Sequence, residues 1–386
     1  MSILDEAFAQ KEYMVSQRNY FHAHPELGLQ EFNTCNHIEE ELEKAGIKFH
    51  RVAGTNVIGE IDSGRPGKTL LIRADIDALP IQEKNEVPYK SQNDGIMHAC
   101  GHDGHAAYLL GAAKIIKEHI ADFTGKVILC FQAAEEIGKG ARDILAAGEV
   151  DNVDRIFGIH FASGLDVGKY GIKSGPDMAS CDRFKITIHG KAAHITTPQS
   201  GADSVFIGAL ITTQLQTVVS RLVSPVEGGI IGVGSFHSGT TYNIIPGEAE
   251  LEGTIRAFSA VNRKKLADAV TKIAQDTAAT YGATADVSIE DICDPCTNPA
   301  DTTAEVIESA KKVVPAENVL TNIDKRFGSD NFADYMRKAP GTYVHVGSGD
   351  SDATRVPHHN ERFDLSPDGL PYAAALAVQY VLDYLK

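Results

Sequence analysis

The sequence predicts an α/β domain that is interrupted by a smaller, inserted α+β domain. Strand and helix patterns alternate through residue 160, a β-α-β-β-α-β pattern begins at residue 181, and further helix and strand patterns follow it. The chain of 386 residues is long enough for two domains of ordinary size. We therefore assign the larger domain to residues 1–180 and 296–386 and the inserted domain to residues 181–295.

In the first part of the chain, helical spacing of apolar residues alternates with short β-branched or apolar runs. The predicted helices are residues 4–21, 35–45, 106–120 and 140–147. The predicted strands are residues 56–61, 69–74, 127–131 and 156–159. Gly46 follows the second helix, at the place where a glycine commonly ends one. This alternation is typical of an α/β sheet that helices cover on both faces.

The inserted part has a different order of elements. Its predicted strands are residues 183–189, 230–237, 249–258 and 284–289, and its predicted helices are residues 203–222 and 262–281. The resulting β-α-β-β-α-β order is that of a ferredoxin-like unit, which forms a complete small domain. Helix and strand patterns resume at residues 303–314, 342–346 and 371–384, and we assign these residues to the first domain.

The charge balance excludes several classes of partner. Acidic residues number 52 and basic residues 36, which gives a formal net charge of −16. Nucleic acids and anionic membrane surfaces attract clustered Lys and Arg, so we expect neither as a partner. No apolar run approaches the ~20 residues that span a bilayer, and the N-terminus lacks the form of a signal peptide. A cytoplasmic location is therefore expected.

The six cysteines are scattered along the chain, which does not suggest a disulfide framework. Cys293 and Cys296 have the CxxC spacing of a redox pair or of half a zinc site. A structural zinc site needs four ligands, and neither a second CxxC motif nor a nearby His pair supplies the others. We therefore assign no function to this pair.

Polar residues follow three of the predicted strands at the point where each strand ends. Residues 69–74 lead into Asp75 and Asp77, residues 127–131 lead into Glu135 and Glu136, and residues 156–159 lead into His160. Ligands of open α/β sheets bind outside the carboxyl ends of the strands. Three neighbouring strand ends that carry Asp, Glu and His therefore predict a metal site.

A dense group of possible ligands precedes the predicted helix 106–120. His98, Cys100, His102 and His105 lie within a few residues of one another, and imidazole is the commonest metal ligand in proteins. The adjacent Glu135 and Glu136 have diverging side chains, so both are not expected to bind the same ion. One of them can bind a metal while the other acts as a general base.

These segments together resemble the metal-dependent aminoacylase and carboxypeptidase family. The resemblance is to its amidohydrolase branch, which contains hippurate hydrolases, indole-acetyl-amino-acid hydrolases and N-acetyl-diaminopimelate deacetylases. The motifs that carry it extend over nearly the whole chain, in the order found in the family. They are residues 22–28, 73–80, 97–105, 134–136, 189–194, 243–246 and 253–256.

The resemblance implies a zinc-peptidase-like α/β catalytic domain with an inserted ferredoxin-like domain that acts in dimerisation and as a lid. It also implies two divalent metal ions for each subunit, manganese or zinc. The implied ligands are Cys100, His102, Glu136, His160 and a histidine near the C-terminus. The spacing to Phe363 favours His359 as this last ligand, but the adjacent His358 leaves the choice open.

The remaining roles that the resemblance implies concern catalysis, the support of ligands and the substrate. Glu135 is the implied general base, and Asp75, Asp77 and His105 are expected to orient metal ligands. His194 is expected to stabilise an oxyanion in the active site of a neighbouring subunit, which implies a homodimer or a higher homo-oligomer. Asn243 and Arg256 are expected to bind substrate, and Arg256 has the geometry to pair with a carboxylate.

One position departs from the family pattern. Relatives often carry an acidic pair before a Phe, whereas this chain has Asp330 and Asn331 before Phe332. We expect this difference to bear on substrate preference more than on catalysis.

The implied function is hydrolysis of the amide bond in N-acyl amino acids, for example N-acetyl or N-benzoyl compounds. A dipeptidase or carboxypeptidase of the same family is the alternative, with a short peptide as substrate. The residues alone leave two further possibilities open. One is a hydrolase with Cys100 as nucleophile and His102 or His105 as base, and the other is a non-catalytic protein that binds metal or peptide.

Overall fold

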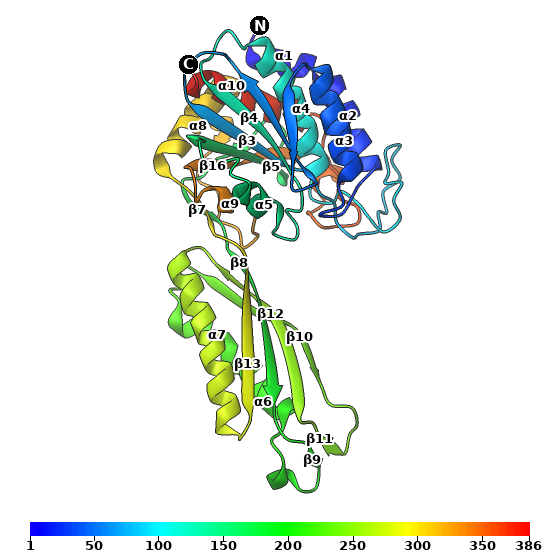
Figure 1. Ribbon diagram of the computed structural model, residues 1–386, viewed down its shortest axis with the longest axis vertical. Helices are drawn as coiled ribbons and strands as arrows, with labels where there is room; N and C mark the ends of the chain where they lie inside the picture. Colours follow the sequence, from blue (N-terminus) through cyan, green and yellow to red (C-terminus); the bar gives the residue numbers. More distant parts are fainter. The chain divides into compact units, whose positions relative to one another are not determined.

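A computed structural model describes residues 1–386 and divides the chain into two compact units (Figure 1). The first unit consists of Met1–Gly175, Asn298–Asp324 and Asp330–Lys386, and the second of Pro176–Thr297 with Lys325–Ser329. Each unit has its own hydrophobic core. The sequence-based domain boundaries lie a few residues inside the second unit, and no sequence pattern indicates that Lys325–Ser329 returns to it.

An eight-stranded sheet forms the centre of the first unit, with the strand order β1-β2-β4-β3-β5-β16-β6-β15. The central strands β4, β3, β5 and β16 run parallel to one another. Both faces of these strands are covered, because every residue of β16 and all but the first of β3 are buried. The strands are β1 (Lys48–Val52), β2 (Asn56–Asp62), β3 (Thr69–Asp75), β4 (Lys126–Gln132), β5 (Arg155–Asp166), β6 (Tyr170–Gly171), β15 (Val319–Leu320) and β16 (Gly341–Gly349).

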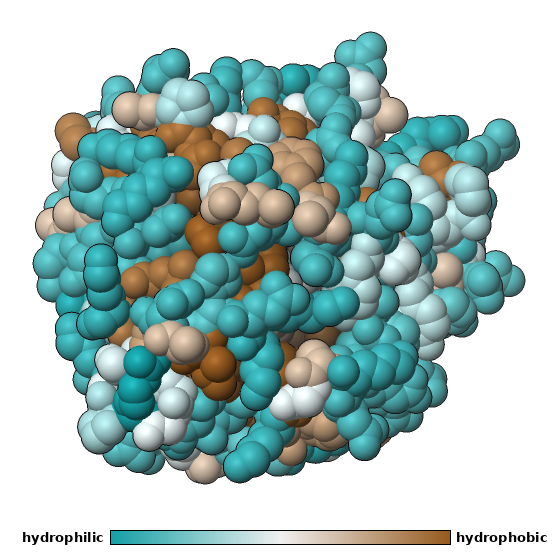
Figure 2. All heavy atoms as spheres, turned by 90° about the horizontal axis from the view of Figure 1, so that it is seen from above, coloured by the Kyte–Doolittle hydropathy of each residue, from teal (hydrophilic) through white to brown (hydrophobic).

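Helices of the first unit pack on this sheet and on each other. Helix α4 contacts β3 and β5, α10 contacts β5 and β16, and α5 contacts β4. The face in Figure 2 is mainly hydrophilic, with hydrophobic residues visible between the polar ones. The helices are α1 (Ile3–Ala9), α2 (Lys11–Ala23), α3 (Phe32–Lys44), α4 (His102–Glu118), α5 (Gly140–Ala146), α8 (Ala300–Val313), α9 (Phe332–Tyr335) and α10 (Gly369–Tyr384).

Several elements of this unit differ from the sequence prediction, and for the short β6, β15 and α9 nothing was predicted. The single helix expected at residues 4–21 is two helices, because the backbone of Gln10 leaves the helical conformation and caps both. Strand β1 was not predicted, since its first three residues are exposed and it lacks an apolar alternation. Strand β5 continues well beyond residue 159, because β16 still pairs with it after β3 has ended.

The second unit has the predicted ferredoxin-like arrangement. Its sheet has the order β10-β12-β8-β13 with antiparallel neighbours, and the apolar sides of α6 and α7 fill the core over it. Two smaller sheets pair β9 with β11 and β7 with β14. The elements are β7 (Gly175–Met178), β8 (Cys181–His189), β9 (Ala193–His194), α6 (Ser204–Leu222), β10 (Gly229–Ser238), β11 (Ile244–Ile245), β12 (Glu248–Ala257), α7 (Ala260–Thr280), β13 (Thr284–Cys293) and β14 (Cys296–Asn298).

Helix α6 is long and apolar enough to cross a membrane by length and composition alone. This property is an average over the helix, since polar residues such as Thr213, Gln214 and Gln216 interrupt its apolar residues. Its position in the fold accounts for part of this apolar character, because Ile207, Ile211 and Leu215 are fully buried in the core of the second unit. Val205 and Phe206, at the start of the same helix, are partly exposed.

Candidate metal centre

The parallel strands bring the predicted site residues to one edge of the sheet. Strand β3 ends at Asp75, and β4 ends three residues before Glu135. Pairing between β3 and β5 ends at Arg73 and Gly158, so His160, two residues further along β5, is level with the end of β3 at Asp75. His160 is nevertheless inside β5, where it pairs with His345 of β16, and does not follow the strand end as predicted. Donor side chains from three strands thus meet at the carboxyl edge.

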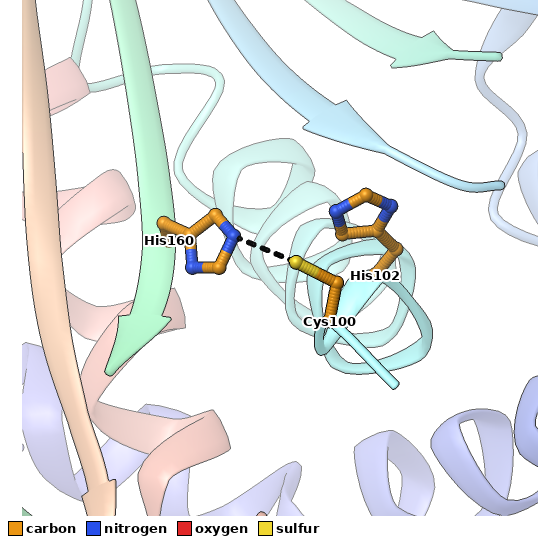
Figure 3. A group of neighbouring side chains, drawn as sticks. All are labelled: Cys100, His102 and His160. Carbon is orange, nitrogen blue, oxygen red and sulfur yellow. Dashed lines mark hydrogen bonds between the residues drawn. The ribbon is translucent and has the colours of Figure 1, made fainter. Parts of the chain in front are cut away.

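The start of helix α4 adds Cys100 and His102 to this edge. Gly101 caps the helix with φ +96°, a left-handed conformation that favours glycine and that turns the chain sharply between the two ligands. Figure 3 shows these side chains close to His160, with the sulfur of Cys100 directed at the imidazole. The distance from Cys100 Sγ to His160 Nε2 is 3.5 Å.

Two groups of donor atoms share the Cys100 sulfur. One group consists of Cys100, His102 and His160, and the other of Cys100, Glu136 and His359. Within each group, the donor atoms lie within 4.8 Å of one another. A thiolate with two available faces can bind two cations at once, so this arrangement fits a pair of ions with a shared sulfur ligand.

Hydrogen bonds fix which nitrogen of each buried imidazole faces this site. His160 Nδ1 donates to the carbonyl oxygen of Phe161 at 2.7 Å, so its lone pair is on Nε2, which faces Cys100. His102 Nδ1 lies 3.0 Å from the carbonyl oxygen of Asp77, and His102 Nε2 is buried without a hydrogen-bond partner. An orphaned, buried nitrogen beside a thiol and a second imidazole is the arrangement expected of a metal ligand.

The protein environment shifts the pKa values of these groups in different directions: burial lowers the pKa of His102, but the nearby Asp75 and Cys100 raise it well above its ordinary value. Burial, together with the nearby His105 and His358, lowers the pKa of His160 well below its ordinary value, which keeps the ring neutral. Burial and the neighbouring Glu136 raise the pKa of the Cys100 thiol well above its ordinary value. Both a nucleophilic cysteine and a metal-binding one act as the thiolate, which this environment does not favour in the absence of a nearby cation.

The adjacent carboxylates Glu135 and Glu136 have different partners. Glu136 Oε1 is buried without a hydrogen bond and lies 3.3 Å from His359 Nε2. Glu135 Oε1 accepts a hydrogen bond of 3.2 Å from the backbone N–H of Asn331. Burial, with the charges of Asp330 and Glu136, raises the pKa of Glu135 well above its ordinary value. Both carboxylates also lie in a donor group with His102, so both face the same centre, and the hydrogen bond from Asn331 distinguishes Glu135 from Glu136.

The two adjacent C-terminal histidines have different surroundings. The backbone N–H of His359 donates to Ala99 at 2.7 Å, which holds it beside the segment that carries Cys100. His359 has φ +61°, an unusual conformation for a residue with a side chain, and it belongs to the donor group with Glu136. The His358 ring instead packs against the rings of His160 and Phe363.

Asp75, Asp77 and His105 lie around the donor atoms. His105 Nε2 accepts the backbone N–H of Phe161 at 3.0 Å, and its Nδ1–H donates to Asp75. Both nitrogens of His105 are thus used, and it has no lone pair left for a metal. Asp75 is buried, which by itself raises a carboxyl pKa, but Arg73, His102 and His105 lower its pKa well below the ordinary range. Asp75 is therefore ionised beside these imidazoles.

The three predicted site residues of the second unit divide into two places. The β9–β11 pair aligns His194 with Ile244, and the backbone N–H of Ile195 donates to the carbonyl oxygen of Asn243. His194 and Asn243 are therefore neighbours. His194 is exposed, and its Nδ1 accepts the backbone N–H of Thr196 at 3.2 Å, which leaves Nε2 to carry the proton of the neutral ring.

Arg256 lies on β12, away from the short β9–β11 sheet. Its Nη1 donates to Ser329 Oγ at 2.7 Å. This bond occupies one of the guanidinium donors and leaves others for a carboxylate.

A second buried cluster near the start of α4 was not predicted. Arg18 donates to Asp103 at 2.8 Å and to Asp364 at 2.5 Å, and so connects the segment of His102 with the segment of His359. His22 lies between Asp103 and Glu83, with Nδ1 2.7 Å from Asp103. In the sequence, only His22 of this cluster drew attention, because it lies in one of the family motifs, and no role could be assigned to it.

Comparison with known proteins places this geometry among metallohydrolases. Residues 71–383 match the model of peptidase family M20/M25/M40. The chain is 37% identical over 388 residues to N-acetylcysteine deacetylase of Bacillus subtilis, covering 99% of this chain and 100% of that protein. It is 36% identical over 370 residues to thermostable carboxypeptidase 1 of Saccharolobus solfataricus, covering 94% and 93% of the two chains.

A solved structure shows the same fold over nearly the full length. It is the Bacillus subtilis YXEP protein, described as a dinuclear metal-binding peptidase of the M20 family. The TM-score is 0.86 at 34% sequence identity, and the alignment covers 98% of this chain and 99% of the other.

Proposed function

The chain belongs to peptidase family M20/M25/M40, in its aminoacylase and amidohydrolase branch, and we propose that it releases amino acids from N-acyl amino acids. Membership makes it a metal-dependent hydrolase that acts on amides. The observation that carries the finer proposal is the pair of donor groups that share Cys100 beside the separate carboxylate of Glu135.

Two divalent metal ions are the cofactors, and the donor atoms fit them. Cys100, His102 and His160 would hold one ion, and Cys100, Glu136 and His359 would hold the other. Sulfur and imidazole suit zinc, while the carboxylate also suits manganese, so the donor set is compatible with either metal. When bound, such ions polarise a carbonyl group and lower the pKa of a water molecule.

The protein's own side chains move the protons and position the substrate. Glu135 accepts a proton from the attacking water and returns it to the leaving amine. The Nε2–H of His194 donates a hydrogen bond to the oxygen that becomes negatively charged during the attack. Arg256 pairs with the carboxylate of the amino acid, and Asn243, beside His194, binds another polar group of the substrate.

A homodimer is part of this proposal, because His194 is expected to act in the partner's active site. Exposed apolar side chains of the second unit support an interface between subunits. They include Val205 and Phe206 on α6, Phe236 on β10 and Ile244 on β11. Phe236 lies against Gly208 of α6, one turn from Val205, and a contiguous apolar patch of this kind commonly marks a site of association.

A dipeptidase or carboxypeptidase is the second candidate function. The identity of 36% with a thermostable carboxypeptidase favours it, because the leaving group is again an amino acid. The two functions differ in the acyl side of the bond, which in a peptide carries an amino group. Parallel assays with N-acetyl, N-benzoyl and dipeptide substrates distinguish them. Faster hydrolysis of dipeptides than of every N-acyl amino acid would contradict the proposal.

A further inference from the structure

A buried arginine connects several segments beneath the candidate metal centre. Arg73, near the end of β3, is fully buried. Its guanidinium donates to Asp75 at 2.6 Å, to Gln132 at 2.9 Å, to Asp330 at 2.8 Å and to Asn331 at 3.0 Å. The charge of Arg73 is thus compensated by two carboxylates, and Asn331 contributes an acceptor without a charge.

Asn331 belongs to this cluster through its side chain and to the active site through its backbone. Its Oδ1 accepts hydrogen bonds from Arg73 and, at 2.8 Å, from Gln132 Nε2. Its backbone N–H donates to Glu135 Oε1 at 3.2 Å. The residue is only 1% exposed. The expectation that Asn331 bears on substrate preference is therefore not supported by its position, since its side chain faces the buried arginine.

We propose that Asn331 is a positioning residue for Glu135. Its side-chain oxygen is fixed by two donors, which fixes the peptide group whose N–H binds one oxygen of the Glu135 carboxylate. The other carboxylate oxygen is then held in one orientation to accept the proton of the attacking water. This inference rests on the proposed role of Glu135 as general base. Loss of such orientation by ~1 Å can lower turnover about 10²-fold without weakening substrate binding.

The surroundings of Asn331 explain why the side-chain oxygen, rather than the amide nitrogen, carries this role. The oxygen satisfies two donors, whereas Nδ2 is buried without a hydrogen-bond partner. An aspartate at this position keeps an acceptor for both donors. A serine is too short to reach both, and an alanine offers none. Substitution by Asp, Ser and Ala therefore weakens, in that order, the hydrogen bonds that hold the side chain of residue 331, while few other contacts change.

The test compares steady-state kinetics and metal content of these variants on an N-acyl amino acid that the wild-type enzyme hydrolyses. For Asn331→Ala we expect kcat to fall by about 10- to 100-fold, with KM within about threefold of wild type and metal content unchanged. Asn331→Ser should show a smaller fall in kcat. Asn331→Asp should restore kcat to within about fivefold of wild type, because its carboxylate still accepts from Arg73 and Gln132.

Asn298, which ends β14 and is the first residue of the segment that returns to the first unit, provides a matched control in the same unit as Asn331. It is also 1% exposed, and its side chain bonds Lys173 and both backbone groups of Tyr343. Asn298→Ala should lower the melting temperature as Asn331→Ala does, yet leave kcat unchanged. A purely structural role of Asn331 would give the two variants the same kinetics, and this result would overturn the proposal.

Two further results separate this inference from the proposed function. If Asn331→Ser folds, binds metal and has the wild-type kcat while Glu135→Gln is inactive, the positioning role of Asn331 is wrong. The role of Glu135 as general base would then stand. If Asn331→Ala does not fold, the Ser and Asp variants decide in the same way. Retained activity of Glu135→Gln would instead remove the general base on which both rest.

Discussion

The Oδ2 atom of Asp77 accepts a hydrogen bond of 3.0 Å from the backbone N–H of Glu136. The other oxygen of the same carboxylate lies 3.3 Å from His102 Nδ1. The buried Asp77 thus orients two candidate ligands, Glu136 after β4 and His102 at the start of α4. Groups of this kind fix the direction of a metal ligand without binding the metal themselves.

Replacement of Asp77 by Ala is expected to weaken metal binding by about 10- to 100-fold, because His102 and Glu136 lose their common partner. Titration of the metal-free protein with Zn²⁺ or Mn²⁺ measures this change. Folding is checked by circular dichroism at the same protein concentration. Unchanged affinity in a folded variant would show that Asp77 does not support the site.

Glu135 and Glu136 form a matched pair for separating catalysis from metal binding. Glu135→Gln should keep the full metal content and lose about 10²- to 10⁴-fold in kcat, because the amide cannot accept a proton. Glu136→Gln should instead lose metal, because it removes a charged donor from the group with Cys100 and His359. Elemental analysis and kinetics of both variants make the comparison. Equal metal loss in the two variants would contradict the separate roles.

The shared position of Cys100 predicts metal stoichiometry. His160→Ala and His359→Ala each damage one donor group and should retain close to one ion per chain, whereas Cys100→Ala damages both groups and should retain fewer. His358→Ala is the control for His359→Ala, because the His358 ring packs beside His160 and lies outside both donor groups. Elemental analysis of the purified variants measures the ratio. Two tightly bound ions in Cys100→Ala would exclude a shared sulfur ligand.

Loss of activity on chelation, and its return with added metal, is a second consequence of this arrangement. A hydrolase with Cys100 as nucleophile would keep its activity in EDTA and lose it with a thiol-alkylating reagent. The raised pKa of the Cys100 thiol predicts slow alkylation of the metal-free protein at neutral pH. Rapid alkylation together with chelator-resistant turnover would support the cysteine mechanism.

The fold and most of the candidate site could be predicted because their signals are local. Short apolar runs that end in Asp75, Glu135 or the vicinity of His160 identify the strand ends, and the topology of a parallel sheet brings them together. The contact between Asn331 and Arg73 has no such signal. These residues are 258 positions apart, and each occurs in a segment whose pattern says nothing about its partner.

The choice between His358 and His359 could not be made from the sequence either. It depends on the backbone of His359, whose φ of +61° directs its side chain to Glu136. Neither residue composition nor spacing predicts a left-handed conformation at a histidine. In the same way, the separation of α1 from α2 depends on the backbone conformation of Gln10, which the spacing of apolar residues does not predict.

Action of His194 across a dimer interface predicts complementation between two inactive variants. In a mixed dimer of Glu135→Gln and His194→Ala, one site contains both defects and the other contains neither. Random exchange makes about half of the dimers mixed, so about a quarter of wild-type activity should return. The activity is measured after subunit exchange and compared with each variant alone. No recovery in verified mixed dimers would contradict action in the partner's site.

Glu31 predicts a pH dependence of stability that is separate from catalysis. It is fully buried and accepts the backbone N–H of Ala134 at 2.8 Å, and burial raises its pKa from 4.5 to about 7. Between these two values the folded state keeps a proton that the unfolded state has released. The free energy of unfolding therefore falls as the pH rises from 4.5 to 7, by about 3 kcal/mol in total at ~1.4 kcal/mol per pH unit.

Replacement of Glu31 by Gln removes this dependence, because the amide keeps an acceptor for Ala134 and never ionises. Relative to wild type, the variant should gain about 3 kcal/mol in the free energy of unfolding between pH 4.5 and pH 8. Urea denaturation of the metal-free proteins at both pH values measures the gain without a contribution from metal binding. The exposed Glu12 on α2, changed to Gln, is the matched control. An equal difference between wild type and Glu31→Gln at both pH values would show that Glu31 ionises alike in the folded and unfolded states.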